Sequence, residues 1–508
     1  MEKGANVTDL FFMRADDHPK RPAIIDRDGT TISFGKLAHD VKETADYYAS
    51  RGIGKGDRVL IFIPMSIDLY RDVLALFHLG ATAVFLDEWV SKERLELCCR
   101  IAGCKGFIAG WKVRLLSIFS RELRRIPVKL GPGWSFVNHP QMNKTTADDT
   151  ALITFTTGST GTPKAAKRTH GFLQAQFDAL VDKIQPKADD IDMPVLPIVL
   201  LLNLGTGVPS VIADYKSNKP GELDPGKIME QIKTHKVNRL TASPFFIRKL
   251  SEFVIQHKLE LPQVRGMFTG GAPVFPDEAA LYVRAFPGCN TTVVYGSTEA
   301  EPISSISAGE LAQQSLDLQS GLDVGPAYHG TQVKIIPVTE DILQFTSLAE
   351  LDAFCLPPGS IGEILVSGRH VLREYVNNPE ALKRNKIFIG GEAWHRTGDA
   401  GFTDPAGHLR LCGRCSTMIL KKDGSYLSPF LYENYFQQMD GVNAGTVLLH
   451  KNKITAILET AAGTDQQATR TKLAAEDHGL EEIIFVKQIP RDPRHNSKID
   501  YGKLKELL

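Results

Sequence analysis

Residues 156–164 read Thr-Thr-Gly-Ser-Thr-Gly-Thr-Pro-Lys and directly follow an apolar run, Ala151 to Phe155, that has the pattern of a buried strand. The glycines allow the backbone to bend so that successive N–H groups face one concavity, and the hydroxyls and the lysine add donors. This is the chemistry of a loop that holds phosphate oxygens. It is not a Walker A loop, because only two residues separate the glycines and Ala165 follows the lysine. We therefore predict a phosphate-binding loop; the alternative is a flexible surface loop.

Three further clusters strengthen this interpretation. Residues 270–273 (Gly-Gly-Ala-Pro) follow an apparent strand and offer bare backbone to a flat ligand. Residues 295–299 (Tyr-Gly-Ser-Thr-Glu) follow a strand at 292–294 and combine an aromatic face, a hydroxyl and a carboxylate. Residues 396–399 (Arg-Thr-Gly-Asp) place a carboxylate on a turn, where it would suit a pair of vicinal hydroxyls. Each cluster alone is typical of an ordinary turn, and only their joint presence in this order indicates a nucleotide site.

Strand and helix patterns alternate along the first part of the chain. Residues 23–26 and 30–34 predict a hairpin, and a helix that ends near Gly52 follows. Residues 58–64 have the pattern of a buried strand and precede a helix at 69–79. The same rhythm returns between 227 and 286. We therefore predict a mainly parallel α/β sheet.

The character of the chain changes after residue 325. Residues 325–413 are rich in glycine and predict strands and turns. The last ~95 residues contain strand patterns at 446–450 and 454–458 and a helix pattern at 467–478, which is enough for a separate small domain.

Composition excludes several classes of protein. At 508 residues the chain exceeds what one hydrophobic core serves, and 59 basic residues balance 59 acidic ones. No bulk field attracts nucleic acid or an anionic membrane, although a local basic patch remains open. The seven cysteines form no even framework and predict reduced thiols in a cytoplasmic protein, and no signal peptide is apparent. Prolines, glycines and Asn203 interrupt the apolar stretch 193–213, so we expect a buried segment rather than a transmembrane one.

These motifs resemble those of the adenylate-forming superfamily, which comprises acyl-CoA synthetases, peptide-synthetase adenylation domains and luciferases. The shared motifs occur in the family's order: TTGSTGTPK from 156, GGAPV from 270, YGSTE from 295, GEI from 362, HRTGD from 395, Gly413-Arg414 and the near-terminal Lys498. The resemblance implies an α/β fold with a large N-terminal domain, residues 1–412, built from two parallel-sheet α/β subdomains and a β-barrel-like part. A small, mobile α+β domain, residues 413–508, would carry the catalytic lysine.

The resemblance also implies roles for single residues. The mobile phosphate loop would consist of Thr156, Thr157, Gly158, Ser159, Thr160, Gly161 and Lys164. Gly271 and Ala272, with Pro273 beside them, would border the adenine, and Tyr295, next to Gly296, would stack on it. Thr298 would meet the α-phosphate and Glu299 would hold Mg²⁺. Asp399 would bind the ribose hydroxyls, with Arg414 close by.

Lys498 is the residue for which we predict the main catalytic role. A carboxylate that attacks the α-phosphorus of ATP brings two anions together, and a lysine between them lowers that cost. Without the resemblance, Lys498 is one more exposed lysine in a charged tail, Arg491 to Lys505.

Two departures concern the second step. The segment Cys415-Ser416-Thr417 replaces the usual hinge after Arg414, which puts transfer to CoA in doubt. The string from Arg494 to Ile499 has Ser497 where most acyl-CoA synthetases have glycine, and it is similar to the olefin β-lactone synthetases. In that subfamily the adenylate of a 3-hydroxy fatty acid closes on its own hydroxyl, which proximity favours. The apolar residues 195–204 would suit an alkyl chain.

Three functions follow as hypotheses. The first is ATP- and Mg²⁺-dependent activation of a fatty or 3-hydroxy fatty acid, followed by β-lactone closure. The second is activation followed by transfer to CoA or a carrier thiol, and the third is a non-catalytic relative that binds nucleotide. We expect no nucleic-acid partner and no transmembrane segment, and the resemblance implies other enzymes of a fatty-acid-derived olefin or lactone pathway as partners.

Overall fold

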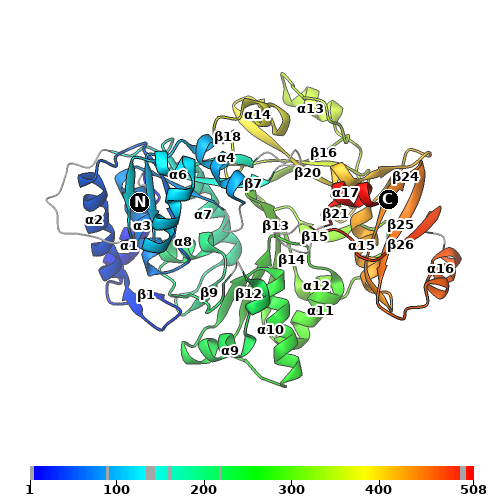
Figure 1. The fold of residues 1–508 in the computed structure, drawn as a ribbon, viewed down its shortest axis with the longest axis horizontal. Coiled ribbons are helices and arrows are strands. Elements are labelled where there is room, and N and C mark those ends of the chain that lie inside the picture. The colour runs from blue at the N-terminus through cyan, green and yellow to red at the C-terminus, as the bar shows by residue number, and fades with distance from the viewer. Residues whose placement is uncertain are drawn as a thin grey trace.

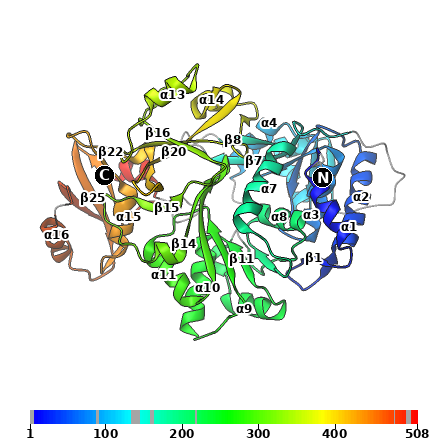
Figure 2. The ribbon, with the colours of Figure 1, turned by 180° about the vertical axis from the view of Figure 1, so that it is seen from behind.

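A computed structural model describes residues 5–86, 91–132, 144–157, 163–216, 219–476, 478–491 and 499–508. The N-terminal lobe and the C-terminal segment lie at opposite ends of the long axis, with the strands β13, β14 and β20 between them (Figures 1 and 2). The predicted α/β class is confirmed, because parallel strands alternate with helices in two large sheets.

The first sheet has seven strands. Its order is β18 (Glu374–Tyr375), β8 (Pro163–Thr169), β7 (Thr150–Thr157), β4 (Thr82–Phe85), β3 (Arg58–Phe62), β5 (Gly106–Ala109), β6 (Val128–Leu130). The strands from β7 to β6 are parallel, and β8 and β18 extend one edge in antiparallel fashion. The strand predicted from residue 58 is confirmed as β3.

Helices connect and cover this sheet. They are α1 (Thr8–Asp17), α2 (Phe34–Ser50), α3 (Ile67–Leu79), α4 (Lys92–Ala102), α5 (Trp111–Leu116), η1 (Ser117–Phe119), α6 (Arg121–Arg125) and α7 (His170–Ile184). Serine hydroxyls define two of the starts: Ser33 accepts the Lys36 N–H and Ser66 accepts the Leu69 N–H. Gly80, in the left-handed conformation with φ 77°, ends α3.

The second sheet has eight strands. Its order is β14 (Ala300–Ser307), β13 (Asn290–Ser297), β12 (Gly266–Gly270), β11 (Arg239–Ala242), β9 (Asp192–Pro194), β10 (Ser210–Val211), β1 (Pro22–Ile25), β2 (Thr31–Ser33). Only the edge strands β14 and β2 are antiparallel to their neighbours. The predicted hairpin at 23–34 is confirmed as β1 and β2. Its helices are α8 (Pro197–Thr206), η2 (Pro220–Glu222), α9 (Pro225–Thr234), α10 (Pro244–Gln256), α11 (Pro276–Ala285) and α12 (Ala308–Leu311).

The third sheet is antiparallel. Its order is β15 (Leu322–Pro326), β21 (His408–Arg414), β20 (Glu392–Thr403), β17 (Gly362–Ser367), β16 (Gln332–Ile336), with β19 (Lys386–Ile389) also on β20. Among the described residues no ladder joins β16 to β15, so this barrel-like part is an open sheet. The helices α13 (Leu348–Phe354) and α14 (Pro379–Asn385) lie in its connections.

The segment after Arg414 contains a hairpin and a three-stranded sheet. Its elements are η3 (Cys415–Thr417), β22 (Ile419–Leu420), β23 (Tyr426–Leu427), α15 (Pro429–Gln437), β24 (Val442–His450), β25 (Lys453–Thr460), α16 (Gln466–Ala475), β26 (Glu482–Val486) and α17 (Tyr501–Leu507). The strands and helix predicted between 446 and 478 are confirmed. This segment also contacts the second sheet's helices, since the Gln438 amide donates to Asp277 at 2.7 Å.

The apolar stretch 193–213 forms a strand, a ten-residue helix and a second short strand. Within the part of the chain that the structure describes, no helix is long and apolar enough to cross a membrane. The side chains of Val199, Leu200, Leu202 and Leu204 are buried in the core. The predicted alkyl-chain lining therefore narrows to residues that stay partly exposed, such as Val195 and Leu196 where β9 ends.

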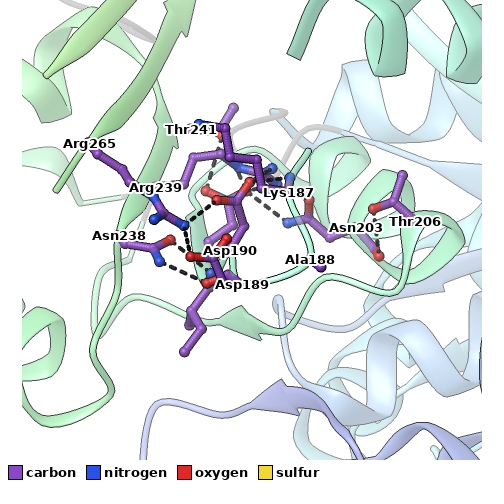
Figure 3. Close-up of polar contacts among 12 residues, drawn as sticks. Lys187, Ala188, Asp189, Asp190, Asn203, Thr206, Asn238, Arg239, Thr241 and Arg265 are labelled. Carbon is purple, nitrogen blue, oxygen red and sulfur yellow. Dashed lines mark hydrogen bonds and ion pairs between the residues drawn. The ribbon is translucent and has the colours of Figure 1, made fainter. Parts of the chain in front are cut away.

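A buried polar network ties this stretch to the second sheet (Figure 3). Arg239 on β11 contacts Asp192 on β9 at 3.2 Å and Asp190 at 3.1 Å. Asn203 on α8 donates to Asp192 at 2.8 Å and to Ser210 at 3.0 Å, while Arg239 donates to the Asn203 carbonyl oxygen. Asp192, Asn203 and Arg239 are at most 2% exposed, so each charge depends on the others for its partners.

We predict that Arg239→Met lowers the free energy of unfolding by about 3–5 kcal/mol, because it leaves buried carboxylates without a cation. Urea denaturation measures this loss. Arg265→Met is the matched control, since the Arg265 side chain is 40% exposed and meets Asp190 from the outside at 3.2 Å. That change should cost no more than about 1 kcal/mol. Equal losses for the two variants would contradict a buried network.

Candidate active site

The predicted phosphate loop joins two paired strands of the first sheet. Thr156 lies near the end of β7 and is the register partner of Lys164 on β8. Gly158, Ser159, Thr160 and Gly161 lie outside the described residues, so their roles stay predictions.

Glu299 is the point at which separate parts of the chain meet. It lies in the tight turn between β13 and β14, and it is only 6% exposed. The hydroxyls of Thr156 and Tyr375 each donate to its Oε1 at 3.3 Å, and the Lys164 ammonium lies 3.8 Å from the same oxygen. The turn is fixed by backbone bonds, since the Leu372 N–H donates to the Glu299 carbonyl at 2.7 Å. Two predicted loop residues and the predicted metal ligand are therefore in contact.

Thr298 occupies the position before Glu299 in this turn. Its carbonyl accepts a hydrogen bond of 3.2 Å from the buried Arg168 guanidinium on β8. At Gly296 a Cβ would lie 3.0 Å from the Ala300 carbonyl oxygen, so the turn has little room for a side chain there. The strand β13 runs to Ser297, three residues further than the sequence predicted.

A second group forms between the second and third sheets. The Tyr295 hydroxyl on β13 donates to Asp399 Oδ2 at 2.7 Å, and Arg414 donates to Asp399 Oδ1 at 2.6 Å. Asp399 on β20 and Arg414 on β21 are register partners. Burial, reinforced by the Asp399 carboxylate, holds the pKa of Tyr295 well above its ordinary value, so this hydroxyl remains a donor. Three predicted nucleotide-binding residues are thus brought together.

The predicted turn at 396–399 is wrong: these residues lie inside β20 and form a bulge. Leu365 pairs with Arg396 and Glu363 with Ala400, which leaves 397–399 without register partners on β17. Gly398 has φ 71° at this bulge. The buried Arg396 guanidinium pairs with Glu363 at 2.6 Å, and the Gly398 N–H donates to Glu363 at 3.1 Å. This ion pair fixes the bulge that presents Asp399.

The third predicted cluster follows β12. Gly270 lies beside Val294 of β13, and a Cβ there would be 2.6 Å from the Val294 carbonyl oxygen, so only glycine fits. Gly271 follows with φ 82°, and Gly271, Ala272 and Pro273 are exposed. Because β12 and β13 are parallel and in register, these residues lie at the same carboxyl edge as Tyr295.

Lys386 on β19 is a site residue that the sequence reasoning missed. Its side chain is 97% buried in the sense that the residue is 3% exposed, and its ammonium has no hydrogen-bond partner. It lies over the Tyr375 ring at 5.9 Å, and Lys164 lies over the same ring at 5.4 Å. Burial lowers the pKa of Lys386 to about 7, although Glu299 opposes that shift. A lysine beginning an otherwise apolar strand, residues 386–389, was the available signal.

Lys498 lies outside the described residues, so its predicted catalytic role is a prediction here as well. The chain on either side of it is paired, because Arg491 and Ile499 form an antiparallel bridge. The hinge segment Cys415–Thr417 forms a single 3-10 turn directly after β21.

Comparison with known proteins agrees with this geometry. The model of the AMP-binding enzyme family matches residues 11–376, so this chain belongs to the family of AMP-binding enzymes and is an adenylate-forming enzyme. It is 29% identical over 93% of its length, and 90% of the other chain, to a protein named olefin beta-lactone synthetase from Stenotrophomonas maltophilia. It is 24% identical over 91% of its length, and 92% of the relative's, to a putative acyl-CoA ligase of Bacillus subtilis. The fold also matches that of ATP-bound MatB from Rhodopseudomonas palustris, with a TM-score of 0.80, 22% identity and 99% of both chains covered.

We predict that Lys386→Met raises the free energy of unfolding by about 1–3 kcal/mol, because it removes a buried ammonium that has no partner. A residue that costs stability is typical of a functional position, so the same variant should bind Mg-ATP several-fold more weakly. Thermal unfolding and calorimetric titration measure the two effects.

Lys167→Met is the control for this variant. Lys167 lies on β8, is 33% exposed and pairs with Glu374 at 2.7 Å. It should change stability by less than about 1 kcal/mol and leave ATP binding unaltered. The assignment of Lys386 to the site fails if both variants bind ATP as the unchanged protein does.

Proposed function

We propose that this enzyme uses Mg-ATP to activate a carboxylic acid, a fatty or 3-hydroxy fatty acid, and then closes the adenylate to a β-lactone. The observation that carries the proposal is the convergence on Glu299 of Thr156, Lys164 and Tyr375, beside the group Tyr295, Asp399 and Arg414. One group supplies cations and hydroxyls for phosphates, and the other supplies an aromatic ring and a carboxylate for a nucleoside.

In the first step the substrate carboxylate attacks the α-phosphorus, the bond to the β-phosphate oxygen breaks, and pyrophosphate leaves. Lys164 and the N–H groups of residues 157–161 would hold the β- and γ-phosphates. Thr298 would contact the α-phosphate from the turn that Arg168 fixes. Lys498, delivered by the domain of residues 413–508, would lie between the carboxylate and the α-phosphate and offset their repulsion.

Glu299 would hold Mg²⁺ together with phosphate oxygens. Mg²⁺ prefers oxygen ligands and takes one or two carboxylates plus substrate phosphates, and Glu299 provides a carboxylate with the Thr156 hydroxyl at 3.3 Å. The ion supplies neutralising charge to the phosphates when bound.

The nucleoside would bind at the edge shared by β12 and β13. Gly271, Ala272 and Pro273 would border the adenine, and Tyr295 and Gly296 would cover it. The Asp399 carboxylate, aimed by its bonds to Tyr295 and Arg414, would accept hydrogen bonds from the two ribose hydroxyls.

In the second step the 3-hydroxyl oxygen attacks the acyl carbon, the bond from that carbon to the AMP phosphate breaks, and AMP leaves with the hydroxyl proton released. The nucleophile is already tethered to the activated carbonyl, which replaces a bimolecular encounter. Two relatives named olefin beta-lactone synthetases, 29% and 28% identical over 93% of the chain, support this second step. Free cysteines, seven in the chain, support a cytoplasmic location.

The second candidate function is acyl transfer to CoA, because relatives at 24% identity are named CoA ligases. The two functions differ in one requirement. Lactone closure needs no thiol, whereas a ligase releases AMP only when CoA is present. Enzymes of a fatty-acid-derived olefin or lactone pathway would be partners under the first function.

We predict steady release of AMP and pyrophosphate from ATP, Mg²⁺ and a long-chain 3-hydroxy acid without CoA, with mass spectrometry showing a product lighter than the acid by one water. Lys498→Ala should lower this rate about a hundredfold or more while ATP still binds. Lys503→Ala, a 63% exposed neighbour on α17, should retain the rate. Turnover that requires CoA would replace lactone closure with thiol transfer, and an unchanged rate in Lys498→Ala would refute the catalytic assignment.

A further inference from the structure

The most apolar exposed surface of the described chain lies far from the nucleotide groups in sequence, on the short helices α5, η1 and α6. Eleven large apolar side chains are strongly exposed among the described residues, and four of them fall within nine consecutive positions. They are Trp111 (65% exposed), Leu115 (59%), Ile118 (50%) and Phe119 (70%). The other seven are scattered over separate elements, so this group is not the ordinary background of exposed apolar residues.

The spacing of these four residues places them on one side of the segment. Trp111 and Leu115 are four residues apart on α5, and Ile118 and Phe119 follow Leu115 by three and four. Residues three and four apart are neighbours on a helical surface. We call residues 111–129, from Trp111 to Lys129, the apolar-basic segment.

The same segment carries a strong local charge in a chain whose net charge is zero. It contains six basic residues and one acidic residue, a balance of +5: Lys112, Arg114, Arg121, Arg124, Arg125 and Lys129 against Glu122. The Glu122 side chain is 11% exposed and is engaged by Arg125 at 3.1 Å and Arg100 at 3.7 Å. The charge that this segment presents outward is therefore positive.

The segment is anchored to the protein, so its exposure is not that of a loose tail. Leu123 and Ile126 are buried in a core cluster with Phe107 and Cys98. Glu96 of α4 accepts hydrogen bonds of 3.1 Å from the Ser120 hydroxyl and the Arg121 N–H. The neighbouring strand β6 is the edge of the first sheet, and α6 lies beside α4 in Figure 1. The fold thus holds the apolar side chains outward at the periphery of the lobe.

We propose that the apolar-basic segment docks the protein on an anionic lipid bilayer. Trp111, Leu115, Ile118 and Phe119 enter the boundary between headgroups and acyl chains, and the surrounding lysines and arginines contact lipid phosphates. Tryptophan, phenylalanine and leucine beside lysine and arginine are the composition of interfacial helices. A nucleic acid would use the basic residues but leave the aliphatic side chains in water, which is why we infer a lipid partner.

The test uses the full-length chain and vesicles of phosphatidylcholine, either alone or mixed with phosphatidylglycerol. We expect co-sedimentation with the mixed vesicles, about tenfold weaker binding to phosphatidylcholine alone, and weakening as salt is raised. The tryptophan fluorescence should shift to the blue on binding, since Trp111 leaves water.

Variants assign the binding to this segment. Trp111→Ser with Phe119→Ser should weaken vesicle binding about tenfold, and Arg121→Glu with Arg124→Glu should do the same for the mixed vesicles. Leu348→Ser with Leu449→Ser is the matched control, because these side chains are 45% and 50% exposed on α13 and β24. ATP binding by all three variants should equal that of the unchanged protein, which separates this proposal from the acyl chemistry proposed above.

Three outcomes overturn the proposal. They are the absence of binding to anionic vesicles, an equal loss in the control variant, and a change of oligomeric state on gel filtration in Trp111→Ser with Phe119→Ser without any vesicle binding. The last result would make the segment an interface between copies of the chain.

Discussion

A single buried carboxylate, Glu299, is the constraint on which the arrangement of the site depends. It receives hydroxyls from β7 and β18 and faces the Lys164 ammonium, so it joins both edges of the strand pair that flanks the predicted phosphate loop. A carboxylate that is 6% exposed is costly unless donors surround it, and here each donor is also suited to a phosphate oxygen. The apoprotein thus uses Glu299 to hold in place groups that an anionic nucleotide would engage.

The three sheets make this convergence possible because each delivers one edge to the same region (Figure 1). The first provides the ends of β7 and β8, the second provides the turn after β13, and the third provides the bulge of β20. Ligands in open α/β sheets bind outside the carboxyl ends of the strands, and the Arg396–Glu363 pair extends this edge by presenting Asp399 beside Tyr295. Lys386 adds an unpartnered cation beneath the Tyr375 ring, which makes the region more favourable to an anion than Glu299 alone would suggest.

Local patterns predicted much of this from the sequence. Glycine and hydroxyl residues behind a strand are a short-range signal, and so are the apolar periods of β3 and α3, which the structure confirms. The bulge at 397–399 was mistaken for a turn because the glycine is visible in the sequence, whereas the pairing of Arg396 with a glutamate 33 residues away is not. Lys386 and Tyr375 were missed for the same reason: their meeting with Glu299 depends on the register of β19 on β20 and of β18 on β8. The composition left a local basic patch open, but only exposure distinguished Trp111 and Phe119 from core residues.

The measurement that tests the central role of Glu299 most directly is the acid-dependent exchange of labelled pyrophosphate into ATP by Glu299→Gln, followed as a function of Mg²⁺ concentration. Glu374→Gln is the control, since Glu374 adjoins Tyr375 but its side chain is 55% exposed. The account predicts about a hundredfold slower exchange in Glu299→Gln, a higher Mg²⁺ requirement and a cooperatively folded protein, with Glu374→Gln unaffected. Exchange by Glu299→Gln within a few-fold of the unchanged enzyme, at the same Mg²⁺ requirement, would contradict it.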